Sequence, residues 1–225
     1  TPTKDEDQSF EIKLYECMIQ LSDPDENPNI NTDHNRIAFR NMLAIIESNA
    51  GLVNENFFKD HKRWHYVLNK WINSKSYEDK MSGVNAMYTF HIEISKTLVK
   101  RRDSSDEQML RMFMDYFSTI LHSSESEPHQ IRIAIRGYGA MAEACKILLE
   151  PEYLTECFEK IMQRIDYCYD MSDKIKRKNV LQQLPIFIES LSKIMTHLKE
   201  VSAIQVQKLE SVIVILIKDF HFLST

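Results

Sequence analysis

The chain has 225 residues and a net charge of −5, and 43% of its residues are apolar. This apolar content excludes an intrinsically disordered chain, and the acidic balance excludes a protein that binds polyanions over its whole surface. Only four glycines and six prolines are present, which is scarce for a β-rich protein, so the composition predicts an all-α fold.

The predicted helices begin close to the amino terminus. We expect amphipathic helices over residues 8–21, 33–49, 55–73 and 76–100, and a polar loop with two prolines at 22–29. A hinge is plausible only at 23–31. In the long fourth helix, Gly83 and Ala86 are expected to allow a close approach of its neighbour. The residues of this helix that are predicted to face inward are Met81, Val84, Met87, Tyr88, Ile92 and Leu98.

The second half of the chain is predicted to be helical as well. We expect helices over 105–121, 128–149, 151–169, 174–183, 185–198 and 202–222. Ser105 with Gln108, and Ser202 with Gln205, have the spacing of a capping box. The apolar run 212–217 is much shorter than the roughly 20 residues that a membrane span needs, and it predicts a buried helix segment.

The helix starts recur along the chain. Those near residues 33, 77, 128 and 174 are about 44, 51 and 46 residues apart, close to the period of HEAT and armadillo repeats. The sequence therefore predicts a HEAT-like helical-repeat solenoid of about four antiparallel helix pairs, with residues 1–225 as a single continuous segment.

Two glycines interrupt an apolar stretch at residues 131–145. The spacing of Gly137, Gly139 and Ala142 matches the relaxed dinucleotide-binding spelling, but that fingerprint needs a strand before it. Pro128 instead predicts a helix start. The same glycines resemble a potassium-filter triplet, yet no segment is apolar enough to cross a bilayer. We favour a helix in which close packing offsets about 1 kcal/mol of destabilisation per glycine.

This stretch carries a resemblance to a known family. The segment 134–139, Ala-Ile-Arg-Gly-Tyr-Gly, and the following Cys145-Lys146 resemble the amino-terminal helical-repeat region of the DNA-dependent protein kinase catalytic subunit family. Weaker similarity extends through 67–71, 81–97 and 153–167. The chain, which begins Thr-Pro-Thr, is expected to be excised from a longer protein.

The resemblance implies a scaffold role. It implies that the segment joins the rest of a parent solenoid in the nucleus and helps to hold the Ku heterodimer and a double-stranded DNA end in non-homologous end joining. The matching residues Gly137, Tyr138 and Gly139 would serve helix packing. The parent would be a serine/threonine protein kinase, but this segment lacks the phosphate-covering, H-R-D and D-F-G motifs of a kinase domain.

No catalytic residue, cofactor or metal site is predicted. His61 and His65 have a metal-ligand spacing, but Lys62 stands where a zinc protease has glutamate, so a solvated basic helix face is favoured. The four cysteines, Cys17, Cys145, Cys157 and Cys168, have no CxxC spacing and are expected to be reduced and mostly buried.

Three basic clusters are the candidate contacts for DNA or a partner. Each is also explained by ordinary solvation of a helix end, where cations are favoured. If two clusters share one face, contact with phosphates becomes credible. The members of the three clusters are Lys59, Lys62, Arg63 and Lys70; Lys100, Arg101 and Arg102; and Lys174, Lys176, Arg177 and Lys178.

Two other functions remain open. A generic protein-binding adaptor would bind acidic or helical partners along the concave face of the solenoid, would line that face with apolar or aromatic residues, and would make no DNA contact. An enzyme has the least support, because no paired acid and base or activated nucleophile is evident.

Overall fold

The computed structural model describes residues 61–73, 77–170, 182–198 and 200–223, together with the single helical positions 37, 41 and 178. Among these residues all regular structure is helical, so the prediction of an all-α fold is confirmed. The chain divides into two compact units, Thr1–Thr89 and Phe90–Thr225. The helix predicted over 8–21, the hinge at 23–31 and nearly all of the helices predicted over 33–49 and 174–183 lie outside the described residues.

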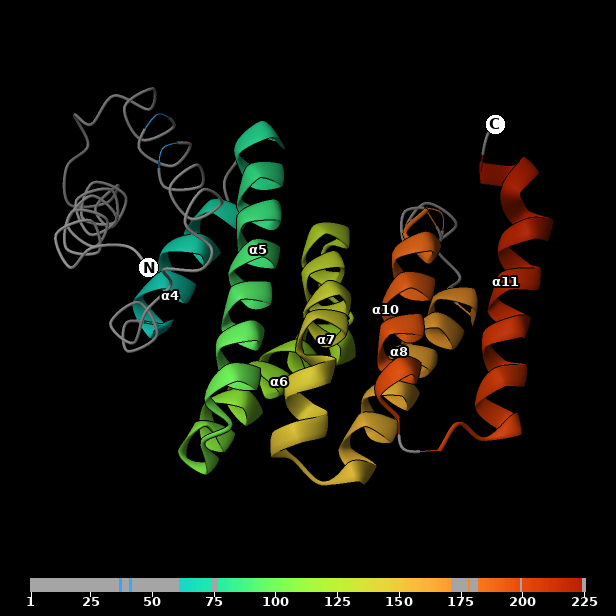
Figure 1. Cartoon of the computed structure of the whole chain (residues 1–225). Coiled ribbons are helices and arrows are strands. Elements are labelled where there is room, and N and C mark those ends of the chain that lie inside the picture. Colours follow the sequence, from blue (N-terminus) through green and yellow to red (C-terminus); the bar gives the residue numbers. More distant parts are fainter. Residues whose placement is uncertain are drawn as a thin grey trace, which may run out of the picture. The chain divides into compact units, whose positions relative to one another are not determined.

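Seven α-helices follow one another in the described part (Figure 1). The sequence predicted the ends of α5, α7, α8, α10 and α11 to within a few residues. The helices are α4 (His61–Ile72), α5 (Tyr77–Arg101), α6 (Glu107–His122), α7 (Pro128–Leu148), α8 (Pro151–Asp170), α10 (Leu184–His197) and α11 (Ala203–Leu223), and the 3-10 helix η1 (Ser104–Asp106) precedes α6.

In the first unit, Gly83 allows α5 to approach α4 closely. A Cβ atom at position 83 would lie 2.9 Å from the backbone nitrogen of Ile72 and 2.9 Å from the carbonyl carbon of Trp71. No side chain fits at such a distance from backbone atoms, so glycine is required there. Val84 and Met87, two of the predicted inward residues, are fully buried.

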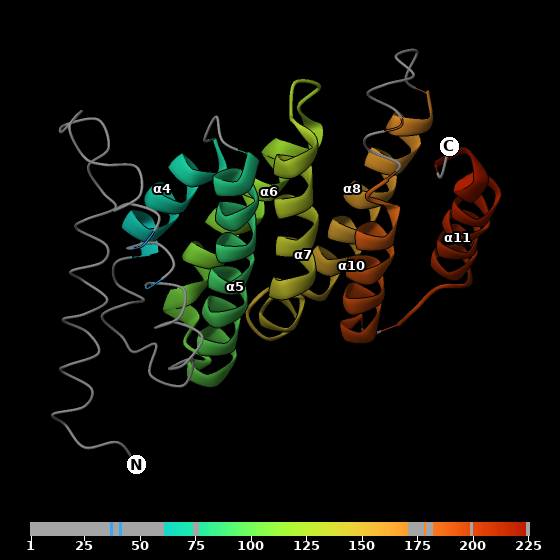
Figure 2. The same ribbon diagram turned by 90° about the horizontal axis from the view of Figure 1, so that it is seen from above.

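In the second unit, four of the described helices, α6, α7, α8 and α10, form two layers. Helix α7 packs mainly against α6 and α10, and α8 contacts α6, α7 and α10. Figures 1 and 2 show α7 and α10 in one layer and α6 and α8 in the other. This layering is the one expected of stacked helix pairs. The predicted solenoid of four pairs over one continuous segment extends beyond these helices and stays a prediction.

The predicted inward face of α5 is partly right. Leu98 is fully buried, but Ile92 is half-buried, and the neighbouring Phe90, His91 and Ile94 are buried although they were not assigned to the core. The His91 ring packs edge-on against Phe117 with 4.9 Å between centroids. A single apolar stripe therefore underestimates the buried surface of this helix.

Two helix starts follow the predicted capping chemistry. In α7, Pro128 occupies the first turn and the Glu127 backbone N–H donates to Gln130 Oε1 at 2.9 Å. In α11, the Ser202 N–H donates to Gln205 Oε1 at 3.0 Å and the Gln205 N–H donates to Ser202 Oγ at 3.2 Å. The capping box predicted at Ser202 is confirmed.

The capping box predicted at Ser105 is wrong. Helix α6 begins only at Glu107, and its N-cap Asp106 makes no side-chain cap hydrogen bond. The Asp106 carboxylate instead forms an ion pair with Arg101, with 3.3 Å between Arg101 Nε and Asp106 Oδ2. The Asp106 N–H donates to the Asp103 carbonyl at 3.0 Å, which closes the 3-10 turn ahead of the helix.

Candidate nucleic-acid and partner interface

The two glycines of α7 face two different neighbouring helices. A Cβ atom at position 137 would lie 2.3 Å from Cζ of Phe117 on α6, and one at position 139 would lie 3.1 Å from Oγ of Ser190 on α10. The Phe117 ring therefore rests directly on the backbone of α7. The stretch 131–145 is helical throughout, so the helical interpretation is confirmed and the strand that a dinucleotide fingerprint requires is absent from it.

Tyr138 lies between these glycines and belongs to the core. It is 1% exposed, and its ring meets that of Phe117 edge-on with 5.4 Å between centroids. Its hydroxyl donates to the Met114 carbonyl at 3.4 Å. Burial raises the pKa of Tyr138 well above its usual range, so the phenol stays neutral and contributes packing rather than charge.

The cluster Lys100–Arg102 lies at the end of α5. Lys100 and Arg101 are in the last turn, where cations are favoured by the helix dipole. Arg101 is engaged by Asp106, so its charge is already compensated. Lys100 and Arg102 are exposed. Two side chains of this cluster are thus available to a solvent-borne anion.

Arg102 has an unusual backbone conformation. Its φ is 52°, the left-handed region, and its N–H donates to the Leu98 carbonyl at 2.9 Å. Glycine is the common residue at this position after a helix, because a side chain there costs about 1 kcal/mol or more. In this chain the position is occupied by arginine.

The other two clusters are described in part. Lys62 on α4 is exposed, and Lys178 is half-buried at a helical position. The side chains of the remaining members lie outside the description. These members are Lys59, Arg63, Lys70, Lys174, Lys176 and Arg177.

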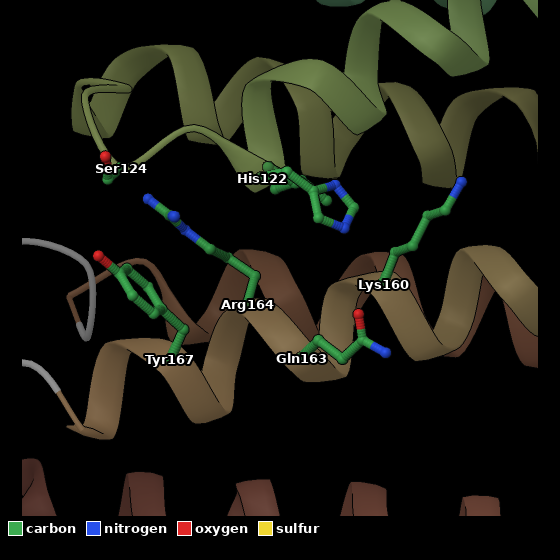
Figure 3. A pocket seen from close by; sticks show the side chains of 7 residues that line it. His122, Ser124, Lys160, Gln163, Arg164 and Tyr167 are labelled. Carbon is green, nitrogen blue, oxygen red and sulfur yellow. The ribbon is translucent and has the colours of Figure 1, made fainter.

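A further group of basic side chains was not singled out in the sequence. Leu121, His122, Ser124, Lys160, Gln163, Arg164 and Tyr167 line a hollow of about 190 Å³ between the end of α6 and the face of α8. Figure 3 shows the His122 ring between the Arg164 guanidinium and the Lys160 ammonium. Lys160 and Arg164 are four residues apart on one helix face, which is the only signal in the sequence for this group.

The described residues form neither a metal site nor a membrane span. Among those residues, no three His, Cys, Asp or Glu side chains lie together in a way that would hold a metal ion. None of the described helices is long and apolar enough to cross a bilayer.

Comparison with known proteins identifies the family. The family model described as "DNA-PKcs, N-terminal" matches residues 1–225. The DNA-dependent protein kinase catalytic subunit of Gallus gallus is 28% identical over 151 residues, which are 67% of this chain and 4% of the relative. The protein of the same name from Xenopus laevis is 24% identical over 221 residues, 98% of this chain and 5% of the relative.

The match confirms the resemblance seen at 134–139 and extends it to the whole chain. The chain spans only about 4 to 5% of the length of the curated relatives that it matches. The matched region is the amino-terminal one and not the kinase domain, so this chain is not a catalytic kinase domain. It belongs to the family of the DNA-PKcs amino-terminal region.

Proposed function

We propose that this chain is a non-catalytic scaffold segment of a nuclear DNA-repair protein kinase, and that it helps to hold Ku and a double-stranded DNA end during non-homologous end joining. The observation that carries the proposal is the family match over residues 1–225. The relatives are named as catalytic subunits of a DNA-dependent protein kinase. A kinase that depends on DNA needs surfaces that contact DNA, either directly or through a partner.

The exposed basic side chains support the DNA part of the proposal. Lys62, Lys100 and Arg102 are solvent-exposed cations. With a net charge of −5, the chain has no general affinity for polyanions, so any DNA contact must come from local positive patches. We expect Lys100 and Arg102 to contact phosphates, because most protein–DNA hydrogen bonds from such side chains are to phosphate oxygens.

The test is the salt dependence of binding to a labelled blunt duplex, measured by fluorescence anisotropy at about 50 and 200 mM salt. Arg102→Gly is the most informative variant. It removes the charge and suits the left-handed backbone at this position, so the free energy of unfolding should stay within about 1 kcal/mol of wild type. The slope of log affinity against log salt should become shallower by about 1.

Lys146→Glu is the matched control for charge. Lys146 is exposed on α7 and distant in sequence from the three clusters. Equal losses of DNA affinity in Lys146→Glu and Lys100→Glu would contradict a local contact at the end of α5. Absence of binding to the duplex at both salt concentrations would contradict the DNA part of the proposal as a whole.

An adaptor that binds protein instead of DNA is the second candidate, and one observation favours it. Helix α11 exposes apolar side chains, and Ile204 and Ile217 are more than 60% exposed. Ile213, Val214 and Ile217 are exposed, so the prediction of a buried segment at 212–217 is wrong at these positions. Exposed apolar side chains along one helix are typical of a protein contact. The exposed apolar residues of this helix are Ile204, Val206, Ile213, Val214 and Ile217.

A further inference from the structure

The hollow between α6 and α8 gathers positive charge from both helices. His122 is the last residue of α6, and Lys160 and Arg164 are on α8. Among the described residues that line the hollow, none is acidic. Lys160 has no ion pair among the described residues, in contrast to Lys208, which pairs with Glu159 on the same helix. The positive charge in the hollow is therefore not compensated by its own walls.

Arg164 is held rigidly in the wall of the hollow. It is only 5% exposed, one Nη donates to the Ser123 carbonyl at 3.1 Å, and the guanidinium lies over the Tyr167 ring at 5.1 Å. A guanidinium has five N–H donors, and the hydrogen bond to Ser123 uses only one of them. Because Arg164 lines the hollow, an anion there would supply acceptors for the Nη–H groups that face it.

One ring nitrogen of His122, Nδ1, is hydrogen-bonded within α6, and the other, Nε2, has no hydrogen bond among the described residues. Its Nδ1 lies 2.8 Å from the Ser118 carbonyl oxygen. A carbonyl oxygen can only accept, so Nδ1 carries a proton and donates it. When the ring is protonated, Nε2–H is a second donor, and in Figure 3 the ring lies between the Arg164 guanidinium and the Lys160 ammonium.

We propose that this hollow binds a phosphomonoester, with Arg164, His122 and Lys160 as its donors. A phosphomonoester carries a charge of about −1.5 to −2 at neutral pH and three acceptor oxygens, which suits two cations, Arg164 and Lys160, together with the His122 ring in its protonated form. A guanidinium binds phosphate oxygens in pairs. A phosphodiester carries a single charge and is flanked on both sides, whereas a terminal phosphate can enter a hollow to reach a buried arginine. The site does not depend on the DNA contacts of the basic clusters.

The test uses isothermal titration calorimetry of the whole 225-residue chain with three probes at equal ionic strength. O-phosphoserine and inorganic phosphate supply the dianion, and dimethyl phosphate supplies the diester monoanion. We expect both dianions to bind and the diester to bind at least tenfold more weakly. Lys160→Gln and His122→Gln should each weaken phosphoserine binding about fivefold to tenfold, because each removes one charge-assisted hydrogen bond.

The control is Lys146→Gln, which removes an exposed lysine of α7 outside the hollow and should leave phosphoserine affinity unchanged. Arg164→Gln should abolish binding, but it also removes the hydrogen bond to Ser123 and can unfold the chain, so the Lys160 and His122 variants decide the result. Three outcomes would each overturn the proposal. These are no binding beyond that of chloride, equal losses in Lys146→Gln and Lys160→Gln, or a diester that binds as tightly as the monoesters.

Discussion

Gly137 is the residue at which α7 and α6 come closest. The Phe117 ring occupies the space that a Cβ atom at position 137 would need. Such a Cβ atom would lie 2.3 Å from Cζ of Phe117. Phe117 is itself enclosed by His91 and Tyr138, so the ring has no room to rotate away. The glycine lowers the intrinsic stability of the helix by about 1 kcal/mol, and the packing of a large aromatic ring onto the backbone offsets it.

Gly137→Leu should therefore destabilise the chain. Overpacking of a filled core costs about 1–3 kcal/mol, and the loss should appear as a lower melting temperature by circular dichroism. Gly137→Ala combined with Phe117→Leu should recover part of the stability that Gly137→Ala loses alone, since the smaller side chain vacates the contact. A melting temperature of Gly137→Leu equal to that of wild type would show that the contact is not tight.

The described cysteines are predicted to be inert at neutral pH. Burial raises the pKa of Cys157 from its ordinary value of 9.0 to about 12, and it raises that of Cys145 as well. The thiolate is the reactive form. Since the folded-state pKa of Cys157 exceeds the unfolded value, its stabilising effect is complete below about pH 9 and is lost as the pH rises toward 12.

Alkylation mapped by mass spectrometry checks this expectation. At pH 8, iodoacetamide should modify Cys145 and Cys157 much more slowly in the native chain than in urea. The free energy of unfolding should decrease between pH 9 and 12. Rapid native modification of Cys157 at pH 8 would mean that this thiol is accessible.

At the scale of the element, α11 packs mainly against one of the described helices, α10. It contacts α10, and Lys208 reaches Glu159 on α8. Its amino-terminal end is fixed by the reciprocal hydrogen bonds of Ser202 and Gln205. A helix with little tertiary support depends more strongly on its caps.

Ser202→Ala should loosen the first turn of α11. Loss of an N-cap hydroxyl costs about 1 kcal/mol, and hydrogen exchange of the Gln205 amide should become about fivefold faster. Ser211→Ala is the control, because the Ser211 hydroxyl donates to the Gln207 carbonyl within the helix and caps nothing. Unchanged exchange at Gln205 in Ser202→Ala would contradict a role of the box in holding this end.

Local sequence chemistry predicted most helix ends and little of the tertiary arrangement. Pro128 and Ser202 act on their own turn, so their effect can be read from spacing alone. The capping box predicted at Ser105 does not form, because Asp106 makes an ion pair with Arg101, a residue of the preceding helix. Such competition between a cap and a tertiary contact is not encoded in a four-residue pattern.

The candidate site was predicted less well than the fold, because it too depends on tertiary contacts that a local sequence pattern does not encode. The basic clusters were found because their members are adjacent in sequence, and the description of Arg101 shows how an apparent contact residue is used within the fold. The hollow was missed because its cations come from two helices. His122 and Arg164 are brought together only by the packing of α6 against α8.

At the scale of the whole molecule, the chain combines a packed helical core with exposed cations outside it. The conspicuous motif at 137–139 lies in the core, so the feature that identifies the family is structural. The residues proposed to meet DNA, such as Lys62 and Arg102, lie on exposed helix positions instead. Substitutions in the core motif should therefore change the stability of the chain, and substitutions of the exposed cations should change its affinity for DNA.

The measurement that tests the central proposal most directly is the affinity of this chain for a DNA end with and without Ku. Fluorescence anisotropy would compare a labelled blunt duplex loaded with Ku, the same duplex alone, and a duplex closed by hairpins that offers no end. We predict the tightest binding to the Ku-loaded end, weaker binding to the bare duplex, and a loss of affinity for both as salt rises. Equal affinity for the three DNAs, or no binding to any of them, would contradict a role in holding Ku and a DNA end.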